Sequence, residues 1–326
     1  MPWRCRFSAP LTVYAGVTQH KARSGSVSAV ELEYRNRTPF PPRGTNVGGG
    51  PVTHDEGDED MAHDRHPAAT SVGPDLFRLD GRTAIITGGA GALGSAIARG
   101  FIAAGARVAI ADRDAAGVEA TVSRLALAGG EALALPVDVT NEAAVEQQIG
   151  ATLDRWGRLD ILINAAGFGS RGAAVDYDRE RFQAIFEVNV TGMFLCCRIA
   201  GRAMIEAGSG AIVNIASIAG LIGYSGNPAY IASKGAVVQL TRALAVEWAT
   251  TGVRVNAIAP GVIQAPGVAA QVAREPAFYD AFRAKHPMDR FGTPEEIVGP
   301  MIFLCAPAAS FVTGHILAVD GGYVAQ

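Results

Sequence analysis

Lysine is the residue that this chain of 326 residues most conspicuously lacks: it stands only at positions 21, 234 and 285, so arginine carries almost all of the positive charge. The formal net charge is −3, which gives no electrostatic reason to expect nucleic acid or an anionic membrane as a partner. Long apolar runs are also missing. No uncharged stretch is long enough to span a bilayer, and no apolar signal-peptide core stands near the start.

Cysteine is scarce as well. The four residues are Cys5, Cys196, Cys197 and Cys305, and none of them has C-x-x-C or metal-ligand spacing. We therefore expect no metal site. The adjacent pair lies in an apolar stretch with helical spacing, where free cysteine usually acts as a small hydrophobe. A reducing cytoplasm is the simplest compartment for such a protein.

Residues 1–74 lack the periodic apolar pattern of the rest of the chain. Prolines at 39, 41 and 42, glycines at 48–50 and an acidic cluster at 55–60 interrupt any regular element. Such a segment cannot bury enough apolar surface to offset its ordering entropy, so we expect a disordered N-terminal extension. Either translation begins at Met61, or the extension has a function of its own. Its acid-poor beginning resembles a transit peptide, but no arginine-rich amphipathic helix is evident.

Short apolar runs alternate with longer helical patterns through residues 75–326. The runs lie at 83–87, 107–111, 132–137, 161–163, 211–215, 254–258 and 316–319, and each is too short for a helix. Helical patterns include 143–156 and 229–250. The alternation predicts an α/β fold in a single domain. Its core would be a Rossmann-type, doubly wound parallel sheet of about seven strands with helices on both faces.

A glycine-rich turn directly follows the first of these strands. Gly89, Gly91 and Gly94 match G-x-G-x-x-G, in which backbone N–H groups and a helix N-terminus approach a pyrophosphate. Asp112 ends the second strand, where a carboxylate accepts hydrogen bonds from ribose hydroxyls and repels the extra phosphate of NADP. The pattern favours NAD, although the adjacent Arg113 leaves some use of NADP open. Alternatively, the glycines only permit positive φ angles and Asp112 caps a helix.

Tyr230 and Lys234 are four residues apart in a predicted helix, so they share one of its faces. Free tyrosine has a pKa of about 10 and is a poor base at neutral pH. A nearby ammonium favours the phenolate. We therefore expect Lys234 to lower the pKa of Tyr230 and make its hydroxyl an effective acid or base. The alternative is a tyrosine and a lysine that share an exposed helix by chance.

Residues 78–326 resemble the short-chain dehydrogenase/reductase family in its common single-domain form. The family's T-G-x-x-x-G-x-G motif is similar to residues 87–94, where Ala92 replaces the middle glycine and Gly91 compensates. Its N-N-A-G turn is similar to residues 164–167, with Ala165 in place of the second asparagine. Ala265 stands where a cofactor-binding threonine is usual, which puts one cofactor contact in doubt.

The resemblance implies roles for individual residues. The catalytic set is Asn189, Ser217, Tyr230 and Lys234, in which the asparagine anchors a proton-relay water and the serine steadies the substrate oxygen. Residues 138–139 would contact adenine, and residues 260–263 would hold the nicotinamide. The implied cofactor contacts are Gly88, Gly89, Gly91, Leu93, Gly94, Asp112, Arg113, Asp138, Val139, Asn164, Ala165, Gly167, Tyr230, Lys234, Pro260, Gly261 and Ile263.

The resemblance also implies an activity: an NAD-dependent oxidoreductase that transfers a hydride between nicotinamide and a secondary alcohol or ketone of a polyol, sugar or sugar acid. One alternative is a 3-oxoacyl-thioester (acyl carrier protein) reductase that uses NAD(P)H. A second is an NAD-binding sensor or scaffold without catalysis. Residues 264–290 are amphipathic and are expected to form either a lid over the site or an ordinary packed helix. Family members form tetramers, so a homotetramer is implied, assembled through helices at 177–207 and 228–251 and the last strand.

Overall fold

The computed structural model describes residues 73–326. The expected N-terminal extension and the candidate start at Met61 therefore lie outside the described residues, apart from positions 73 and 74. A short 3-10 turn, η1 (Pro74–Phe77), leads into the first strand.

Seven parallel strands form one sheet in the order β3-β2-β1-β4-β5-β6-β7. Their bounds are β1 (Thr83–Thr87), β2 (Arg107–Asp112), β3 (Ala132–Pro136), β4 (Ile161–Asn164), β5 (Gly210–Ile215), β6 (Val253–Pro260) and β7 (Ile316–Val319). Each strand coincides with one predicted apolar run to within two residues at either end. The predicted parallel sheet of about seven strands is confirmed.

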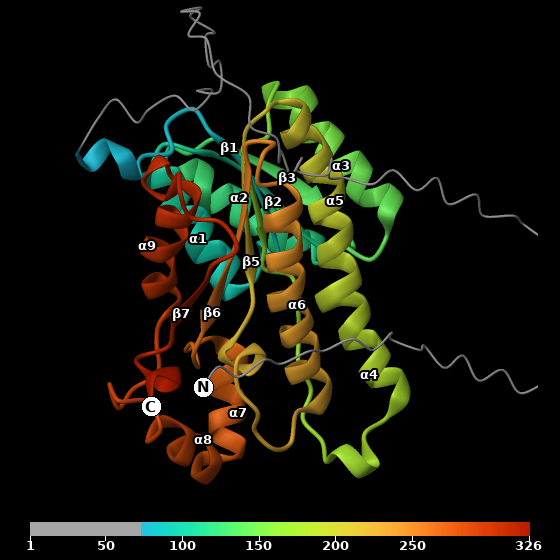
Figure 1. Cartoon of the computed structure of the whole chain (residues 1–326), viewed down its shortest axis with the longest axis vertical. Coiled ribbons are helices and arrows are strands. Elements are labelled where there is room, and N and C mark those ends of the chain that lie inside the picture. Colours follow the sequence, from blue (N-terminus) through green and yellow to red (C-terminus); the bar gives the residue numbers. More distant parts are fainter. Residues whose placement is uncertain (1–72) are drawn as a thin grey trace, which may run out of the picture. The chain divides into compact units, whose positions relative to one another are not determined.

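Helices cover both faces of this sheet (Figure 1). On one face lie α1 (Ala92–Ala103), α2 (Ala115–Leu127) and α9 (Pro294–Cys305), and on the other lie α3 (Glu142–Trp156), α5 (Met193–Glu206) and α6 (Pro228–Glu247). Side chains alternate along each strand between the two cores. In β1, for example, Ile85 packs with the second group of helices and Ile86 with the first. The doubly wound arrangement follows, because both faces of the strands are apolar.

The long helix expected at 177–207 is interrupted. It consists of α4 (Arg179–Phe186), a π-helical turn η3 (Glu187–Gly192) and α5. Its length and mean hydropathy of 1.4 would suffice to cross a membrane, but half of the apolar window is buried inside the fold. The sequence contains no uncharged stretch long enough to span a bilayer, and this helix is no exception, because it contains Arg198 and Arg202. π-turns inside helices are frequent at functional sites, and this one contains Asn189.

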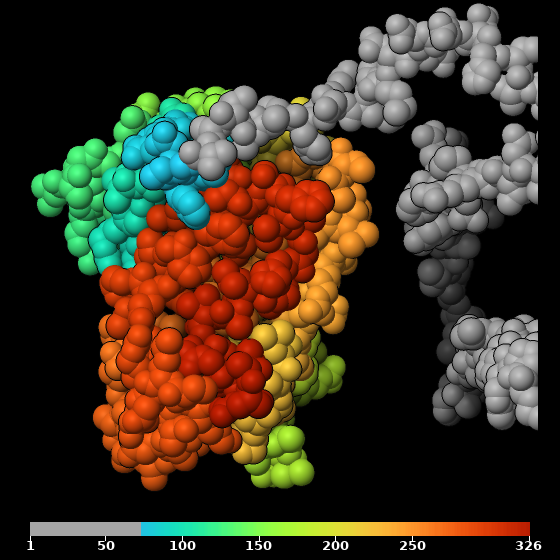
Figure 2. Space-filling view, turned by 60° about the vertical axis from the view of Figure 1, so that its left-hand side comes forward, coloured from blue at the N-terminus to red at the C-terminus, as the bar shows by residue number. Residues whose placement is uncertain are grey.

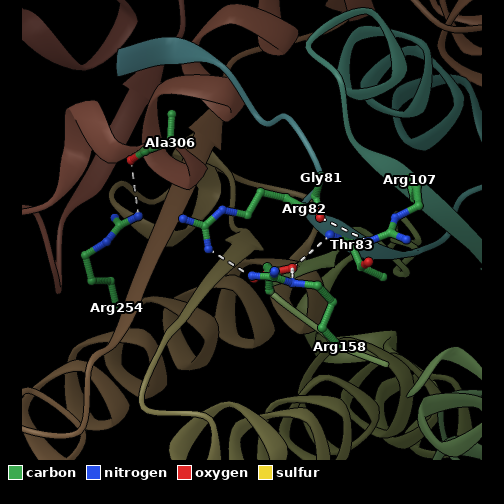
Figure 3. A network of polar contacts seen from close by, with 8 residues as sticks. Gly81, Arg82, Thr83, Arg107, Arg158, Arg254 and Ala306 are labelled. Atoms are coloured by element: carbon green, nitrogen blue, oxygen red, sulfur yellow. Dashed lines mark hydrogen bonds and ion pairs between the residues drawn. The ribbon is translucent and has the colours of Figure 1, made fainter. Parts of the chain in front are cut away.

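Asp160 joins the amino ends of β1 and β4. Its carboxylate accepts hydrogen bonds from the Thr83 N–H at 2.9 Å, from Arg82 at 3.0 Å and from Arg158 at 2.8 Å. Figure 3 shows Arg82, Thr83 and Arg158 converging at this point. Burial is the strongest single influence on the pKa of Asp160 and raises it, but the hydrogen bonds, that from Arg158 foremost, outweigh burial and leave the pKa lowered. This network fixes the amino edge of the sheet at β1 and β4.

Two short helices follow β6 within residues 264–290, namely α7 (Pro266–Arg274) and α8 (Pro276–Arg283). Tyr279 and Phe282 of α8 are buried, whereas α7 contributes no buried residue. Figure 2 shows this part of the chain, in deep orange, beside the red C-terminal part. Residues 264–290 therefore contain a pair of helices, of which only the second is anchored in a core, and their role as a lid stays a prediction.

Candidate active site

The loops after β1 and β4 meet at the carboxyl edge of the sheet, where the strand order reverses. The Thr87 hydroxyl accepts hydrogen bonds from the N–H groups of Ala165 at 3.2 Å and Ala166 at 3.3 Å. Gly88 packs so closely on the same turn that a Cβ there would lie 2.7 Å from the Ala165 backbone. In open α/β sheets, ligands bind in the crevice at such a switch point.

The glycine-rich turn leaves the first N–H groups of α1 available. Gly88 has a φ of 66°, and a Cβ on Gly94 would lie 2.3 Å from the Gly88 carbonyl oxygen. Within residues 73–326 no side chain caps α1, whereas Asp114 caps α2 and Asn141 caps α3. An uncapped helix N-terminus beside a tight glycine turn suits an anion, and it fits the pyrophosphate of a dinucleotide. The predicted contacts Gly89, Gly91 and Leu93 lie in the same turn and at the start of α1.

Asp112 ends β2 beside this turn. Its carboxylate accepts hydrogen bonds from the N–H groups of Ala90 at 3.3 Å and Asp114 at 3.2 Å. The alternative that Asp112 caps α2 is wrong, because the cap is Asp114, which accepts from the Gly117 N–H at 3.1 Å. Arg113 is exposed next to it. A carboxylate held against the glycine turn fits the predicted ribose contact.

Asp138 and Val139 follow β3 at the same edge of the sheet. The Asp138 carboxylate accepts hydrogen bonds from the backbone N–H and the hydroxyl of Thr140, at 2.9 and 2.8 Å, and these bonds lower its pKa. The charge of Arg113 adds a smaller lowering. Val139 is buried in the core. The exposed carboxylate of Asp138 therefore lies near the end of β2, at the place where adenine is predicted to bind.

Asn164 has a different environment from the one we expected for a cofactor contact. Its side-chain amide donates to Asn214 Oδ1 at 2.9 Å and to Cys197 Sγ at 3.1 Å. Asn214 in turn donates to the Thr241 hydroxyl at 2.9 Å. The side chain is therefore engaged in a buried network that joins β4, β5 and α6. Its Oδ1 is buried and has no hydrogen-bond partner among the described residues, and a contact of Asn164 with a cofactor stays a prediction.

Asn189 lies in the π-turn and is fully engaged within the protein. Its side chain accepts a hydrogen bond from the Phe168 N–H at 3.0 Å and donates to the Phe168 carbonyl at 2.9 Å and to Ser233 at 3.0 Å. These bonds hold the loop after β4 against α6. The neighbouring Gly167 is restricted too, because a Cβ there would lie 3.0 Å from Asn189 Oδ1 and 3.7 Å from Lys234 Nζ.

Ser217, Tyr230 and Lys234 come together at the carboxyl end of β5. Ser217 follows this strand and shares a hydrogen bond with the Tyr230 hydroxyl. Tyr230 and Lys234 lie on α6, and the lysine Nζ is 5.6 Å from the centre of the tyrosine ring. The ammonium donates to the Ile215 carbonyl at 2.6 Å and is only 5 % exposed. The alternative of an exposed, accidental pair is therefore wrong.

The pKa values of this pair are shifted by burial. Burial raises the pKa of Tyr230, and the hydrogen bond with Ser217 lowers it only in part. Burial also lowers the pKa of Lys234 to about 8. The expectation that Lys234 lowers the tyrosine pKa is thus wrong for these side chains by themselves, because both lose water. A lysine with this pKa can exchange protons near neutral pH, which an arginine could not do.

The predicted nicotinamide turn is held by backbone contacts. β6 ends at Pro260, and the Gly261 N–H donates to the Val319 carbonyl at 3.0 Å. Ile263 forms an isolated parallel bridge with Gly292. The turn is therefore fixed between β7 and the segment after α8, at the same edge of the sheet as the glycine turn.

Two structural neighbours of Tyr230 are not predicted from the sequence motifs. The Ser233 hydroxyl donates to the Tyr230 carbonyl at 2.8 Å and also accepts the bond from Asn189. Gly169 lies against the tyrosine ring, where a Cβ would stand 2.9 Å from a ring carbon. Only Ser233 gives a signal in the sequence, because it directly precedes Lys234. The closeness of Gly169 depends on how the loop folds back.

Arg171 connects this loop to the proposed lid. It forms an ion pair with Glu275 at 2.5 Å, and its guanidinium lies 3.7 Å from the centre of the Phe278 ring. Glu275 stands between α7 and α8. The loop after β4 and the helix pair are therefore joined next to Tyr230.

The doubly wound sheet, the uncapped helix at the glycine turn and the Ser-Tyr-Lys cluster define a dinucleotide-binding oxidoreductase. A family model described as enoyl-(acyl carrier protein) reductase matches residues 88–324. Galactitol 2-dehydrogenase (L-tagatose-forming) of Cereibacter sphaeroides is 43% identical over 250 residues, which cover 76% of this chain and 97% of that protein. D-threitol dehydrogenase of Mycolicibacterium smegmatis is 38% identical over 247 residues, covering 76% and 94%.

A solved structure gives the same result. The gluconate 5-dehydrogenase from Burkholderia cenocepacia J2315, in complex with NADP and tartrate, is 34% identical and has a TM-score of 0.74, covering 77% of this chain and 98% of that one. The chain belongs to the short-chain dehydrogenase/reductase family. It is an oxidoreductase that acts on CH–OH groups. The expected class of oxidoreductase is thus confirmed.

Proposed function

We propose that the protein oxidises a secondary alcohol of a polyol, sugar or sugar acid with NAD, and that Tyr230 takes the hydroxyl proton. The observation that carries the proposal is the meeting of Ser217, Tyr230 and Lys234 at the carboxyl edge of the sheet, which also holds the glycine turn. The two polyol dehydrogenases among the relatives support the substrate class.

The residues divide the chemistry between them. Ser217 and Tyr230 hydrogen-bond the reacting oxygen, and Tyr230 as phenolate accepts its proton while the carbon gives up a hydride with both electrons. A bound nicotinamide supplies the hydride acceptor. Lys234 is the next group that can carry the proton away, because its pKa of about 8 lies close to ambient pH. Asn189 fixes the loop beside both side chains. In reduction, each transfer runs in reverse.

A preference for NAD over NADP is part of the proposal. The Asp112 carboxylate stands at the glycine turn, where it would bond ribose hydroxyls and repel a 2′-phosphate. The NADP in the related gluconate 5-dehydrogenase makes this preference worth measuring. Arg113 is the nearby group that could offset Asp112. A 3-oxoacyl-thioester reductase would instead be expected to prefer NADPH.

The helix pair α7–α8 is proposed as the substrate lid. It is joined to the loop beside Tyr230 through Arg171, and only its second helix is anchored by buried side chains. An element with few buried contacts opens at low free-energy cost, as a lid must. Substrate choice would then depend on side chains of residues 264–290.

We also propose a homotetramer in the cytoplasm. Phe182 of α4 and Phe194 and Ile205 of α5 are 36–39% exposed although apolar, and β7 lies at one edge of the sheet. Association through these helices and this strand would cover them. The three cysteines of the described part are free and buried, as expected in a reducing compartment. Light scattering that gives the mass of one chain would contradict the tetramer.

The test is NADH formation from a panel of polyols, sugars, sugar acids and hydroxyacyl thioesters. Tyr230→Phe should lower kcat by about 10²–10⁴, the usual contribution of acid–base catalysis, with an unchanged Kd for NAD. In the unsubstituted enzyme, oxidation should accelerate as the pH rises, because burial raises the pKa of Tyr230 and only the phenolate accepts a proton. The matched control is Tyr224→Phe, which removes a neighbouring, half-buried phenol and should keep most of kcat. Near-normal turnover of Tyr230→Phe would refute the assignment.

A further inference from the structure

The segment that follows β7 packs against α8. Figures 1 and 2 both show this red segment beside the orange helix. The ring of Tyr323 stacks on the ring of Phe282 in α8, with the two centres 5.2 Å apart and the planes at 27°. The same ring meets the imidazole of His286, which follows α8, edge to face at 4.9 Å. Tyr323 therefore contacts both the helix and the segment that leaves it.

Hydrogen bonds on either side of Tyr323 hold the two segments together. The Met288 N–H donates to the Gly321 carbonyl at 3.2 Å. The side-chain amide of Gln326 donates to the Lys285 carbonyl at 2.5 Å. The backbone that carries the ring of Tyr323 is therefore attached to the chain that leaves α8.

Asp320 fixes the turn that presents this ring. Its carboxylate accepts hydrogen bonds from the N–H groups of Gly322 at 3.0 Å and Val324 at 2.9 Å. Gly322 has a φ of 87°, a conformation that favours glycine. Asp320 directly follows β7, so the position of the ring is set by the sheet. The sheet thus supplies the fixed side of the contact with α8.

The same contact reaches the candidate active site. Tyr323, Phe282 and Ile218 form one buried cluster, in which each residue is at most 9% exposed. Ile218 directly follows Ser217, and Val262 of the predicted nicotinamide turn packs against the cluster. Together with Tyr323, α8 therefore packs on the turn of Ser217 and on the nicotinamide turn.

The support of α7 is much weaker. None of its residues is buried, and no side chain of the described residues caps it. A side-chain hydrogen bond to α8 runs from the Tyr279 hydroxyl to Gln271 at 2.5 Å. One such bond changes an opening equilibrium by about tenfold or less. Each of the two aromatic pairs of Tyr323 contributes a factor of about two to ten in addition to the burial of its area. We therefore expect α7 to open more readily than α8.

We propose that Tyr323 is a positioning residue that keeps α8 seated on the turn of Ser217 while α7 alone opens to admit the substrate. Glu275, which follows α7 and precedes α8, is the pivot. This inference rests on the proposed role of residues 264–290 as a lid, and it assigns the movement to the first of the two helices. A wall that is already in place before the substrate arrives reduces the ordering cost of binding.

Hydrogen exchange of the full chain, followed by mass spectrometry without substrate, tests this division between the helices. In the unsubstituted protein, the amides of α7 should exchange at least about tenfold faster than those of α8. Tyr323→Ala should accelerate exchange in α8 about tenfold or more, because it removes both aromatic pairs, and should change α7 little.

The matched control is Tyr323→Phe. Stacking uses the ring and not the hydroxyl, so exchange in α8 should stay within about threefold of the unsubstituted protein. The internal control is α3, which packs in a different core cluster. Its exchange should be equal in all three proteins, which separates a local release of α8 from a loss of global stability.

Steady-state kinetics with galactitol and NAD then relates the position of α8 to function. Tyr323→Ala should raise the KM for galactitol about tenfold and leave kcat within about threefold, because a released α8 lowers the fraction of enzyme that is competent to bind substrate. Tyr323→Phe should restore the KM. A KM that stays unchanged although α8 is released would overturn the positioning role.

Three results of the exchange experiment would also overturn the proposal. These are equal exchange of α7 and α8 in the unsubstituted protein, acceleration of α3 together with α8 in Tyr323→Ala, and equal effects of the two substitutions at Tyr323. Because exchange is measured without substrate, a failure of the proposed polyol oxidation would leave this result intact, and the exchange experiment alone would then decide.

Discussion

Gly94→Ala adds one methyl group where the backbone of the glycine turn leaves no room for it. The new Cβ would lie 2.3 Å from the Gly88 carbonyl oxygen and 2.8 Å from the Gly89 Cα. Ordinary contacts begin at 3.4 Å, so either the turn or the start of α1 must move by about 1 Å. Both neighbours are backbone atoms, so no flexible side chain can absorb the change.

The expected loss of stability follows from two opposing effects. Overpacking by one methyl group costs about 1–3 kcal/mol, while a Gly-to-Ala change inside a helix otherwise contributes about 0.5–1 kcal/mol. We expect Gly94→Ala to lower the free energy of unfolding by roughly 1–2 kcal/mol. Gly150→Ala isolates the favourable effect, because a Cβ in the middle of α3 has nothing within 4 Å. That variant should be more stable by about 0.5–1 kcal/mol.

Dinucleotide binding should respond to the same movement. A displacement of about 1 Å at a binding or catalytic group can cost about 10²-fold, so we expect Gly94→Ala to raise the Kd for NAD between tenfold and a hundredfold. Gly91→Ala is the control within the same motif. Gly91 has a φ of −70°, and its Cβ would meet only the Gly88 carbonyl oxygen, at 3.2 Å. A few tenths of an ångström relieve that contact, so the effect should be small.

Urea unfolding and calorimetric titration with NAD measure both quantities on the three variants. The reasoning is refuted if Gly94→Ala matches Gly150→Ala in stability and Gly91→Ala in affinity. Loss of stability without loss of affinity would mean that α1, and not the turn, moves to relieve the contact. The N–H groups of α1 would then not be the pyrophosphate site.

Two further perturbations test the amino edge of the sheet and the cofactor preference. The folded pKa of Asp160 is lowered, so its contribution to stability is present above the unfolded pKa of about 4 and is lost as the pH falls through the folded value. Below pH 4, the free energy of unfolding measured in urea should therefore fall more steeply with falling pH for the unsubstituted chain than for Asp160→Asn. Parallel pH profiles of the two proteins would contradict this. Asp112→Asn should raise the ratio of kcat/KM with NADP to that with NAD about tenfold, because one repulsive charge is removed; an unchanged ratio in initial-rate assays would contradict the ribose contact.

The strands can be predicted from the sequence because a parallel sheet with helices on both faces leaves no polar side to its strands. Ile85 and Ile86 point into different cores, yet both are buried, so β1 appears as an unbroken apolar run. The same reasoning gives the glycine turn and its position before a helix. It cannot give the π-turn at Asn189, because an extra residue in a helical turn changes no periodic pattern enough to be seen.

The environment of a side chain is harder to predict than its position. Spacing places Tyr230 and Lys234 on one face of a helix, but the sign of their pKa shifts depends on how completely α6, β5 and the covering loop exclude water. Asn164 is a second example. Its partners Asn214 and Thr241 become neighbours only when two strands and a helix have packed, so the motif alone could not distinguish a core amide from a cofactor contact.

Two departures from the family motifs fall where the backbone, and not the side chain, makes the contact. Ala165 replaces an asparagine, but what the structure uses there is its N–H, which donates to Thr87. Ala92 replaces a glycine at the start of α1. The glycines that the structure does require are Gly88, Gly89 and Gly94, because a Cβ on any of them would lie within 3.0 Å of another atom, and all three are retained. These substitutions are therefore compatible with the dinucleotide site.

Ala265 is different, because a threonine there would have a use for its side chain. It is the N-cap residue of α7, and no side chain of the described chain caps that helix. A cap of this kind is worth about 1 kcal/mol. Since α7 contributes no buried residue either, the first helix of the proposed lid is stabilised by little besides its connection to α8. We therefore expect Ala265 to favour an open state of the proposed lid, at the expense of substrate affinity more than of the chemistry at Tyr230.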